Sequence, residues 1–199
     1  HTIRTLMNVR ADKVLRLTML LHDVAKPVCI TTDEEGQDHF KKHPAVGADM
    51  AKQILRRLKF DNKTIDCCCR LVKEHDDRPQ ITPKNVRRAM SRIGAGLFPM
   101  LFEVKRADML GQSLYKRKEK MAYIDEFERV YNEILSDDQC VSKKDMKING
   151  RDLIDLGMEP GQKLGEILDK LYEMVLDDPE LNDHEKLIEH ANKIISTLI

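Results

Sequence analysis

Apolar residues recur at intervals of three and four along almost the whole 199-residue chain, which is the spacing of a helical face. The run from Leu15 to Leu21 shows this spacing, as do Ile124, Phe127, Tyr131 and Ile134. Alternation of apolar and polar residues, the mark of a strand, is weak. Only 5% of residues are aromatic and 34% are charged, a balance that favours charge-covered helices over a β-sandwich. The sequence therefore predicts an all-α protein.

Proline and polar stretches divide this helical pattern. Lys26-Pro27 predicts the end of the first helical region, because proline interrupts a continuing helix. The polar stretch 31–38 predicts a loop, in which a short hairpin is possible. His43-Pro44 resembles a helix start, since proline is favoured in the first helical turn.

The polar run Ser136-Asp137-Asp138 is the clearest internal boundary. It predicts a helical bundle over residues 1–135 and a smaller helical tail over residues 136–199. The chain carries 34 basic and 34 acidic residues, so its overall charge indicates no polyanionic partner, and contact with nucleic acid would need a local patch.

The five cysteines do not resemble a secreted disulfide framework, because their number is odd and three of them are consecutive, Cys67 to Cys69. We expect reduced, mostly packed thiols in a cytoplasmic protein. No apolar stretch approaches the ~20 residues needed to cross a bilayer, so we expect no membrane partner.

A histidine and an aspartate stand side by side directly after the apolar run that ends at Leu21. Neighbouring helical residues diverge by ~100°, so both can reach one metal ion only where a helix end lets them converge. Further imidazole and carboxylate side chains, which hydrolytic metal centres use, precede and follow this pair at intervals of about one helix. The six candidate ligands are His1, His22, Asp23, His43, His75 and Asp108.

Three of the candidates also have a simpler explanation. His75 lies at an expected helix C-terminus, where a histidine favours the helix dipole. His43 would serve as an N-cap, and Asp108 as an exposed or capping residue in an apolar helix. His184 and His190 lie on polar helical faces, and we expect both to be solvated.

The spaced pattern of histidines and aspartates resembles the HD superfamily of metal-dependent phosphohydrolases. LLHDVAKP at 20–27 resembles the helix end that carries the HD pair. HFKKHPAVGADMAKQILRRLKF at 39–60 is similar to the following segment of CCA-adding enzymes, the tRNA nucleotidyltransferases of the poly(A) polymerase family. INGRDLIDLGMEPGQKLGEILDKL at 148–171 resembles the C-terminal part of the same bacterial enzymes.

This resemblance implies a helical bundle that holds one or two divalent ions. It implies that His1, His22, Asp23 and Asp108 hold one ion, that His43 and His75 complete a second site, and that Asp23 bridges the two. Ligands of this kind accept Mg, Mn, Ni, Co, Fe or Zn. Asp23 and Lys26 are the candidate catalytic residues, and the phosphate-binding candidates are Lys26, Arg78 and Arg106.

The implied activity is that of a phosphatase or 2′,3′-cyclic phosphodiesterase acting on a nucleotide or a tRNA 3′ end. Nothing in the chain matches the N-terminal nucleotidyltransferase head of CCA-adding enzymes, so we expect a C-terminal fragment that lacks this head. One alternative is a non-catalytic scaffold that binds tRNA through Lys143, Lys144, Lys147, Arg151 and Lys163. Another is a stand-alone HD nucleotidase or diadenosine-tetraphosphate hydrolase, which leaves 148–171 unexplained.

Overall fold

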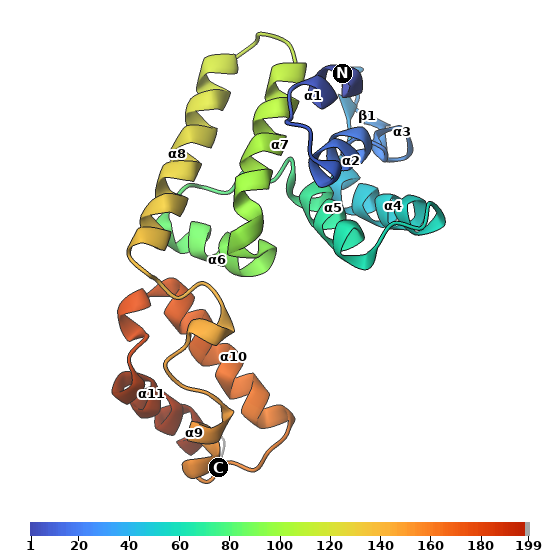
Figure 1. Cartoon of the computed structure of the whole chain (residues 1–199). Coiled ribbons are helices and arrows are strands. Elements are labelled where there is room, and N and C mark those ends of the chain that lie inside the picture. Colours follow the sequence, from blue (N-terminus) through green and yellow to red (C-terminus); the bar gives the residue numbers. More distant parts are fainter. Residues whose placement is uncertain (198–199) are drawn as a thin grey trace. The chain divides into compact units, whose positions relative to one another are not determined.

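Helices make up almost all of the regular structure in the computed structural model, which describes residues 1–197 (Figure 1). Within these residues the only strands are β1 (Thr31–Thr32) and β2 (Asp38–His39), which pair antiparallel with Thr31 opposite His39. Gly36 supplies the positive φ, 78°, that the turn between them needs. The all-α prediction is confirmed, and the polar stretch 31–38 forms most of a short hairpin.

The chain forms two compact units that are each discontinuous in sequence. Unit 1 comprises His1–Pro79 with Gly96–Glu128, and unit 2 comprises Gln80–Ala95 with Arg129–Ile199. The assignment of a phosphohydrolase domain to residues 1–135 and an RNA-binding tail to residues 136–199 stays a prediction. No helix of residues 1–197 is both long and apolar enough to cross a membrane.

Unit 1 contains the helices that carry the six candidate ligands. Asp12 and Asp61 cap two of these helices by accepting hydrogen bonds from the backbone N–H groups of Leu15 and Thr64. The elements are α1 (Thr2–Met7), α2 (Lys13–Leu21), α3 (Lys26–Cys29), α4 (His43–Arg57), α5 (Asn62–Glu74), α7 (Phe98–Gly111) and the first part of α8 (Arg117–Ser136), with the 3₁₀ turn η1 (Ala95–Leu97) before α7.

The prediction that Lys26-Pro27 ends the first helical region is wrong. Helix α2 already ends at Leu21, and Lys26-Pro27 instead begins α3. Proline is tolerated there because the first helical turn has no acceptor for its missing N–H. The predicted helix start at His43-Pro44 is confirmed, with Lys42 rather than His43 as the N-cap.

Two apolar clusters hold the helices of unit 1 together. Buried Leu21, Ala51, Leu55 and Val72 pack α2, α4 and α5 against one another. A second cluster joins α7 to α8, in which the rings of Phe98, Phe102 and Phe127 meet edge to face with centroids 5.5–5.6 Å apart. These clusters hold the end of α2, the start of α4, the end of α5 and the interior of α7, where five of the six candidate ligands lie.

Unit 2 has its own core of apolar side chains from α9, α10 and α11. Buried Arg87 of α6 closes the C-terminal end of α10 by donating hydrogen bonds to the carbonyl oxygens of Leu176 (2.8 Å) and Asp177 (3.0 Å). The elements of unit 2 are α6 (Pro83–Ile93), the remainder of α8, η2 (Lys143–Asp145), α9 (Gly150–Asp155), α10 (Gln162–Asp177), η3 (Pro179–Leu181) and α11 (His184–Ser196).

All five cysteines of the protein are free thiols, and Cys68 and Cys140 are buried.

We expect Phe102→Ala to lower the free energy of unfolding by about 3–5 kcal/mol, because it leaves a cavity where α7 packs on α8. Urea denaturation followed by circular dichroism measures the change. Leu114→Ala is the matched control, since Leu114 is 76% exposed, and it should leave the midpoint almost unchanged. Equal effects of the two substitutions would contradict the assignment of the phenylalanine cluster as core.

Candidate metal centre

All six candidate ligands come together in unit 1, although they lie on five separate stretches of the sequence. His1 precedes α1, and His43 begins α4. His22 is the C-cap of α2 and His75 the C-cap of α5. Asp23 follows His22 in the turn, and Asp108 projects from within α7. The adjacent His-Asp pair thus sits at a helix end, where both side chains converge.

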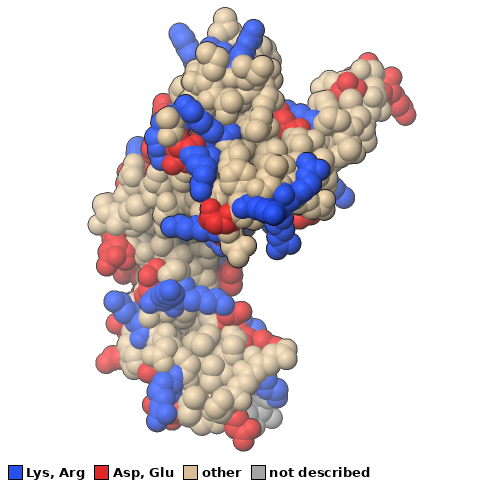
Figure 2. All heavy atoms as spheres, turned by 45° about the vertical axis from the view of Figure 1, so that its right-hand side comes forward, with Lys and Arg blue, Asp and Glu red and all other residues tan. Residues whose placement is uncertain are grey.

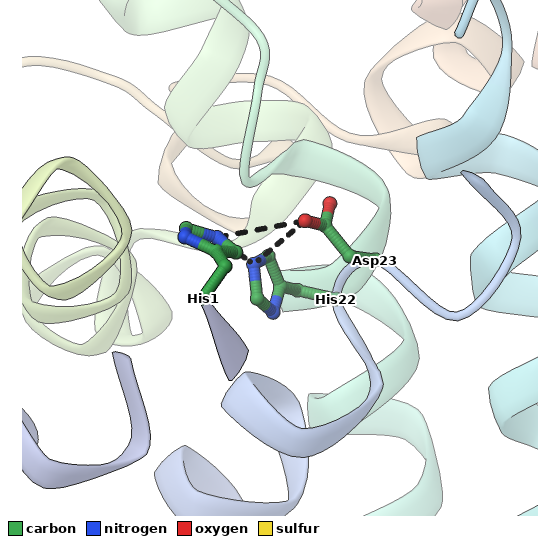
Figure 3. Close-up of side chains that lie close together, drawn as sticks. All are labelled: His1, His22 and Asp23. Carbon is green, nitrogen blue, oxygen red and sulfur yellow. Dashed lines mark hydrogen bonds and ion pairs between the residues drawn. The ribbon is translucent and has the colours of Figure 1, made fainter. Parts of the chain in front are cut away.

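The first group of candidate ligand atoms contains the Nε2 atoms of His1 and His22, which are 3.1 Å apart. Oδ2 of Asp23 lies 3.5 Å from Nε2 of His1 and 3.4 Å from Nε2 of His22. Oδ1 of Asp108 lies 2.9 Å and 3.4 Å from the same two nitrogens. Figure 3 shows the two imidazole rings directed toward the Asp23 carboxylate.

The second group faces the other oxygen of the same carboxylate. The Nε2 atoms of His43 and His75 are 3.3 Å apart, and they lie 3.5 Å and 3.7 Å from Oδ1 of Asp23. Each group of Asp23 with two histidines has ligand atoms within 4.8 Å of one another and could hold a metal ion. Asp23 therefore has the position of a bridging ligand.

Backbone carbonyl groups orient three of the four imidazoles in the same way. A carbonyl oxygen only accepts a hydrogen bond, so the Nδ1 of each ring must carry a hydrogen, and in the neutral form of the ring Nε2 is left with a lone pair. The three contacts join Nδ1 of His22 to Met19 O (2.8 Å), Nδ1 of His43 to Phe40 O (2.8 Å) and Nδ1 of His75 to Val72 O (2.7 Å).

These residues fit a divalent cation. Two ligands ~2.1 Å from an ion and 90–109° apart are ~3.0–3.4 Å from each other, close to the spacings at the centre. Within residues 1–197, the buried Oδ1 of Asp23 has no hydrogen-bond partner. The facing Nε2 atoms of His43 and His75 would likewise repel as two lone pairs without a proton or cation between them.

The electrostatics of the centre keep its aspartate charged. Burial opposes the charged form of His22, but the hydrogen bond with Asp108 and the charge of Asp23 raise its pKa overall. Burial also acts to raise the pKa of Asp23, whereas His75, Lys26 and His22 lower it, and the net shift is strongly downward. Asp23 is therefore anionic at neutral pH.

Lys105 of α7 supports the candidate metal centre, although it was not predicted from the sequence as a site residue. Its buried ammonium donates to the carbonyl oxygens of Glu74 (3.1 Å), His75 (3.0 Å) and Asp77 (2.6 Å), which fixes the chain around His75. Burial lowers the pKa of Lys105 to about 8, so the ammonium form still predominates at pH 7. The available signal was that Lys105 lies three residues before Asp108, and therefore on the same face of the helix.

Gln112 and Gly111, which end α7, were also missed. Gln112 Nε2 donates to Oδ2 of Asp108 (2.8 Å) and leaves the other carboxylate oxygen directed at His1 and His22. A Cβ on Gly111 would lie 2.4 Å from Cγ2 of Thr5 and 3.2 Å from Nδ1 of His1. Only glycine lets α1 approach α7 closely enough to bring His1 to the centre.

Two hollows adjoin the ligands, and the phosphate-binding candidates differ in their relation to them. Lys26 lines one hollow with Phe40 and His43, and its Nζ lies 2.7 Å from Oδ2 of Asp23. Arg78 lines the other hollow beside His75 and pairs with Asp76 at 3.2 Å.

Arg106 is not brought to the centre. Its guanidinium pairs with Asp125 and Glu128 of α8, which raise its pKa against the effect of burial, and it lines neither hollow. The structure therefore gives no support to Arg106 as a phosphate contact at this site.

The five RNA-binding candidates lie on unit 2, and all are exposed. Lys143 pairs with Asp169, and Arg151 lies 3.4 Å from Asp155. Within residues 1–197, Lys144, Lys147 and Lys163 form no ion pair. Basic and acidic side chains are interspersed over the face shown in Figure 2, in agreement with the formal net charge of zero.

Comparison with known proteins places the chain in a family. Residues 45–191 match the family model for domain 2 of tRNA nucleotidyltransferases. The chain belongs to the tRNA nucleotidyltransferase family. The predicted relationship to CCA-adding enzymes is thereby confirmed. The matched residues include His75 and Asp108 of the centre and all five RNA-binding candidates.

Three curated relatives agree with this tRNA nucleotidyltransferase assignment. The A-adding tRNA nucleotidyltransferase of Deinococcus radiodurans is 32% identical over 82% of this chain and 38% of its own length. The CC-adding tRNA nucleotidyltransferase of Thermus thermophilus is 30% identical over 79% of this chain and 35% of its own length. The CCA-adding enzyme of Ligilactobacillus salivarius is 47% identical over 27% of this chain and 14% of its own length.

The chain therefore spans little more than a third of the length of the first two relatives. No solved structure matches it.

In this tRNA nucleotidyltransferase family member we expect Gly111→Ala to displace Thr5 and His1, because the added methyl group overpacks the contact between α1 and α7. The free energy of unfolding should fall by about 1–3 kcal/mol. Thermal and urea unfolding measure the change. Gly96→Ala is the matched control, since a Cβ there meets nothing within 4 Å. A Gly111→Ala protein as stable as Gly96→Ala would show that α1 does not pack closely on α7.

Proposed function

We propose that unit 1 is an HD-type metal-dependent phosphohydrolase that acts as a phosphatase or 2′,3′-cyclic phosphodiesterase on a nucleotide or a tRNA 3′ end. The observation that carries this proposal is the shared carboxylate of Asp23, which directs one oxygen to each of two histidine pairs. An ordinary buried aspartate would direct its oxygens to hydrogen-bond donors, and Oδ1 of Asp23 has none within residues 1–197.

Bound divalent ions supply two things to such a reaction, a water ligand of lowered pKa and positive charge beside the phosphoryl oxygens. The chain's own part is to hold the ligands with their Nε2 lone pairs directed inward, through the carbonyl contacts of His22, His43 and His75. Asp108 is held in the same manner by Gln112.

Lys26 is the residue of the chain best placed to meet the substrate phosphate. Its side chain is 36% exposed and lines a hollow at the centre, and its ammonium pairs with the Asp23 carboxylate. It can therefore donate a hydrogen bond to a phosphoryl oxygen without leaving the site. Lys41 lines the same hollow and adds a second positive charge. Both lysines draw an anionic substrate toward the ligands and offset its charge.

The proposal predicts that the protein hydrolyses one P–O bond of a 2′,3′-cyclic nucleotide, giving the nucleoside 2′- or 3′-monophosphate, in the presence of Mn²⁺, Ni²⁺, Co²⁺, Mg²⁺, Fe²⁺ or Zn²⁺. Asp23→Asn and His22→Ala should each lower kcat/KM by more than about 100-fold, because each removes a ligand from the metal centre. His184→Ala is the matched control, since His184 is exposed on unit 2, and it should retain wild-type activity. Turnover that is absent with every metal, or equal in His22→Ala and wild type, would refute a phosphohydrolase.

A second function, tRNA binding by unit 2, is favoured by a separate observation. The family match covers the exposed cations of unit 2, and the relatives are named for tRNA. Lys144, Lys147 and Lys163 are exposed and form no ion pair within residues 1–197, so their charges are available to phosphates. In this proposal unit 2 holds tRNA for a nucleotidyltransferase head that is not part of this sequence.

The tRNA proposal predicts an affinity that falls with salt, because each phosphate contact releases counterions. Replacing Lys144, Lys147 and Lys163 together by alanine should weaken tRNA binding and reduce the slope of log K against log salt by about 2–3. Filter binding over a series of KCl concentrations measures both. The control replaces Lys52, Lys63 and Lys73, three exposed lysines of unit 1, and should keep the wild-type slope. A slope that is flat, or equally reduced by the control, contradicts a phosphate-binding face on unit 2.

A further inference from the structure

A cavity of about 300 Å³ lies directly beside the candidate metal centre, between the end of α5, α7 and the start of α8. His75, Asp108 and Gln112 line both this cavity and the hollow that contains Lys26. A molecule held at the ligands can therefore extend into the cavity past the side chain of Asp108. The volume is at the lower end of the ~300–1,000 Å³ typical of small-molecule sites, which suits one compact group.

The inner wall of this cavity is apolar apart from the buried Lys105 and the side chains shared with the candidate metal centre, and it contains one aromatic ring. Met109 and Ile124 are buried and contribute aliphatic surface. Tyr123 adds its half-buried ring, which is fixed because its hydroxyl donates a hydrogen bond to Pro79 O at 2.7 Å. A flat aromatic group would find an immobile stacking surface there.

The rim of the cavity is mainly cationic. Arg78, Lys116 and Lys120 line it, against Glu119 as the one carboxylate in addition to Asp108. Lys120 donates to Oε1 of Gln112 at 2.8 Å, and Lys116 has no ion pair within residues 1–197. An apolar wall beneath a cationic rim suits a ligand that is planar at one end and anionic at the other. A phosphate ester without a base would leave the apolar wall uncovered.

We propose that this cavity is the base-binding subsite of the phosphohydrolase site, which takes the nucleobase of a nucleotide whose reacting phosphate lies at the centre. Tyr123 stacks on the base, and Met109 and Ile124 cover its edge. Lys116 and Arg78 face a further phosphate of the bound nucleotide or RNA. This inference rests on the proposed function and makes the substrate a nucleotide rather than any phosphate ester.

The chain contains no tryptophan, so the fluorescence of a single tryptophan introduced on the rim of the cavity comes from that position alone. In Glu119→Trp, adenosine 2′,3′-cyclic phosphate should quench the fluorescence saturably in the presence of a chelator, since a bound base lies against the introduced ring. Lys118→Trp is the matched control, because Lys118 is exposed on the same turn of α8 and does not line the cavity. Ribose 5-phosphate, which lacks a base, should leave both proteins unchanged.

Adding Tyr123→Ala to Glu119→Trp should weaken nucleotide binding about ten-fold, whereas Tyr123→Phe, which keeps the ring, should bind as before. Equal quenching of the two reporters, no saturation, or equal binding of ribose 5-phosphate would overturn the subsite. Binding is measured without metal and without turnover. A protein that binds the nucleotide but never hydrolyses it contradicts the proposed function alone, and one that hydrolyses it with no signal from the cavity contradicts the subsite alone.

Discussion

The carboxylate of Asp23 is the group on which the organisation of unit 1 depends. Its two oxygens face two different histidine pairs, and those pairs come from four separate places in the sequence. A partly buried anion of this kind is costly unless cations or donors surround it. The ends of α2 and α5 and the start of α4 therefore have to meet at one point, and the apolar clusters of unit 1 hold them there.

Helix α7 carries the candidate ligand Asp108. It also carries residues that support the centre without being candidate ligands themselves. Lys105 fixes the chain around His75, Gln112 fixes the far oxygen of Asp108, and Gly111 admits α1 with His1. The same helix forms one side of the cavity beside the ligands. One element thus sets both the geometry of the centre and the shape of the space where a substrate would lie.

Much of this site could be predicted from residue types and spacing. Adjacent His22 and Asp23 require a helix end, and α2 ends at Leu21. The supporting residues could not be predicted in this way, because their roles arise from contacts between segments far apart in the sequence, such as Gly111 with Thr5. Lys26-Pro27 was misjudged because a proline is compatible both with the residues that follow a helix and with the first turn of a new one, and here it opens α3. Arg106 was misplaced because carboxylates of α8, unseen in its local sequence, already pair with it.

Family membership and site chemistry answer different questions about this protein. The family match relates the chain to tRNA nucleotidyltransferases, whereas the proposal of a metal centre rests on the arrangement of the six candidate ligands. Metal content tests that claim most directly, by mass spectrometry of wild type and Asp23→Ala after dialysis against Mn²⁺. We predict one or two bound ions per wild-type chain and a loss of the bound metal in Asp23→Ala. A wild-type chain that binds none, or an Asp23→Ala chain that binds as much, would contradict a metal centre organised by Asp23.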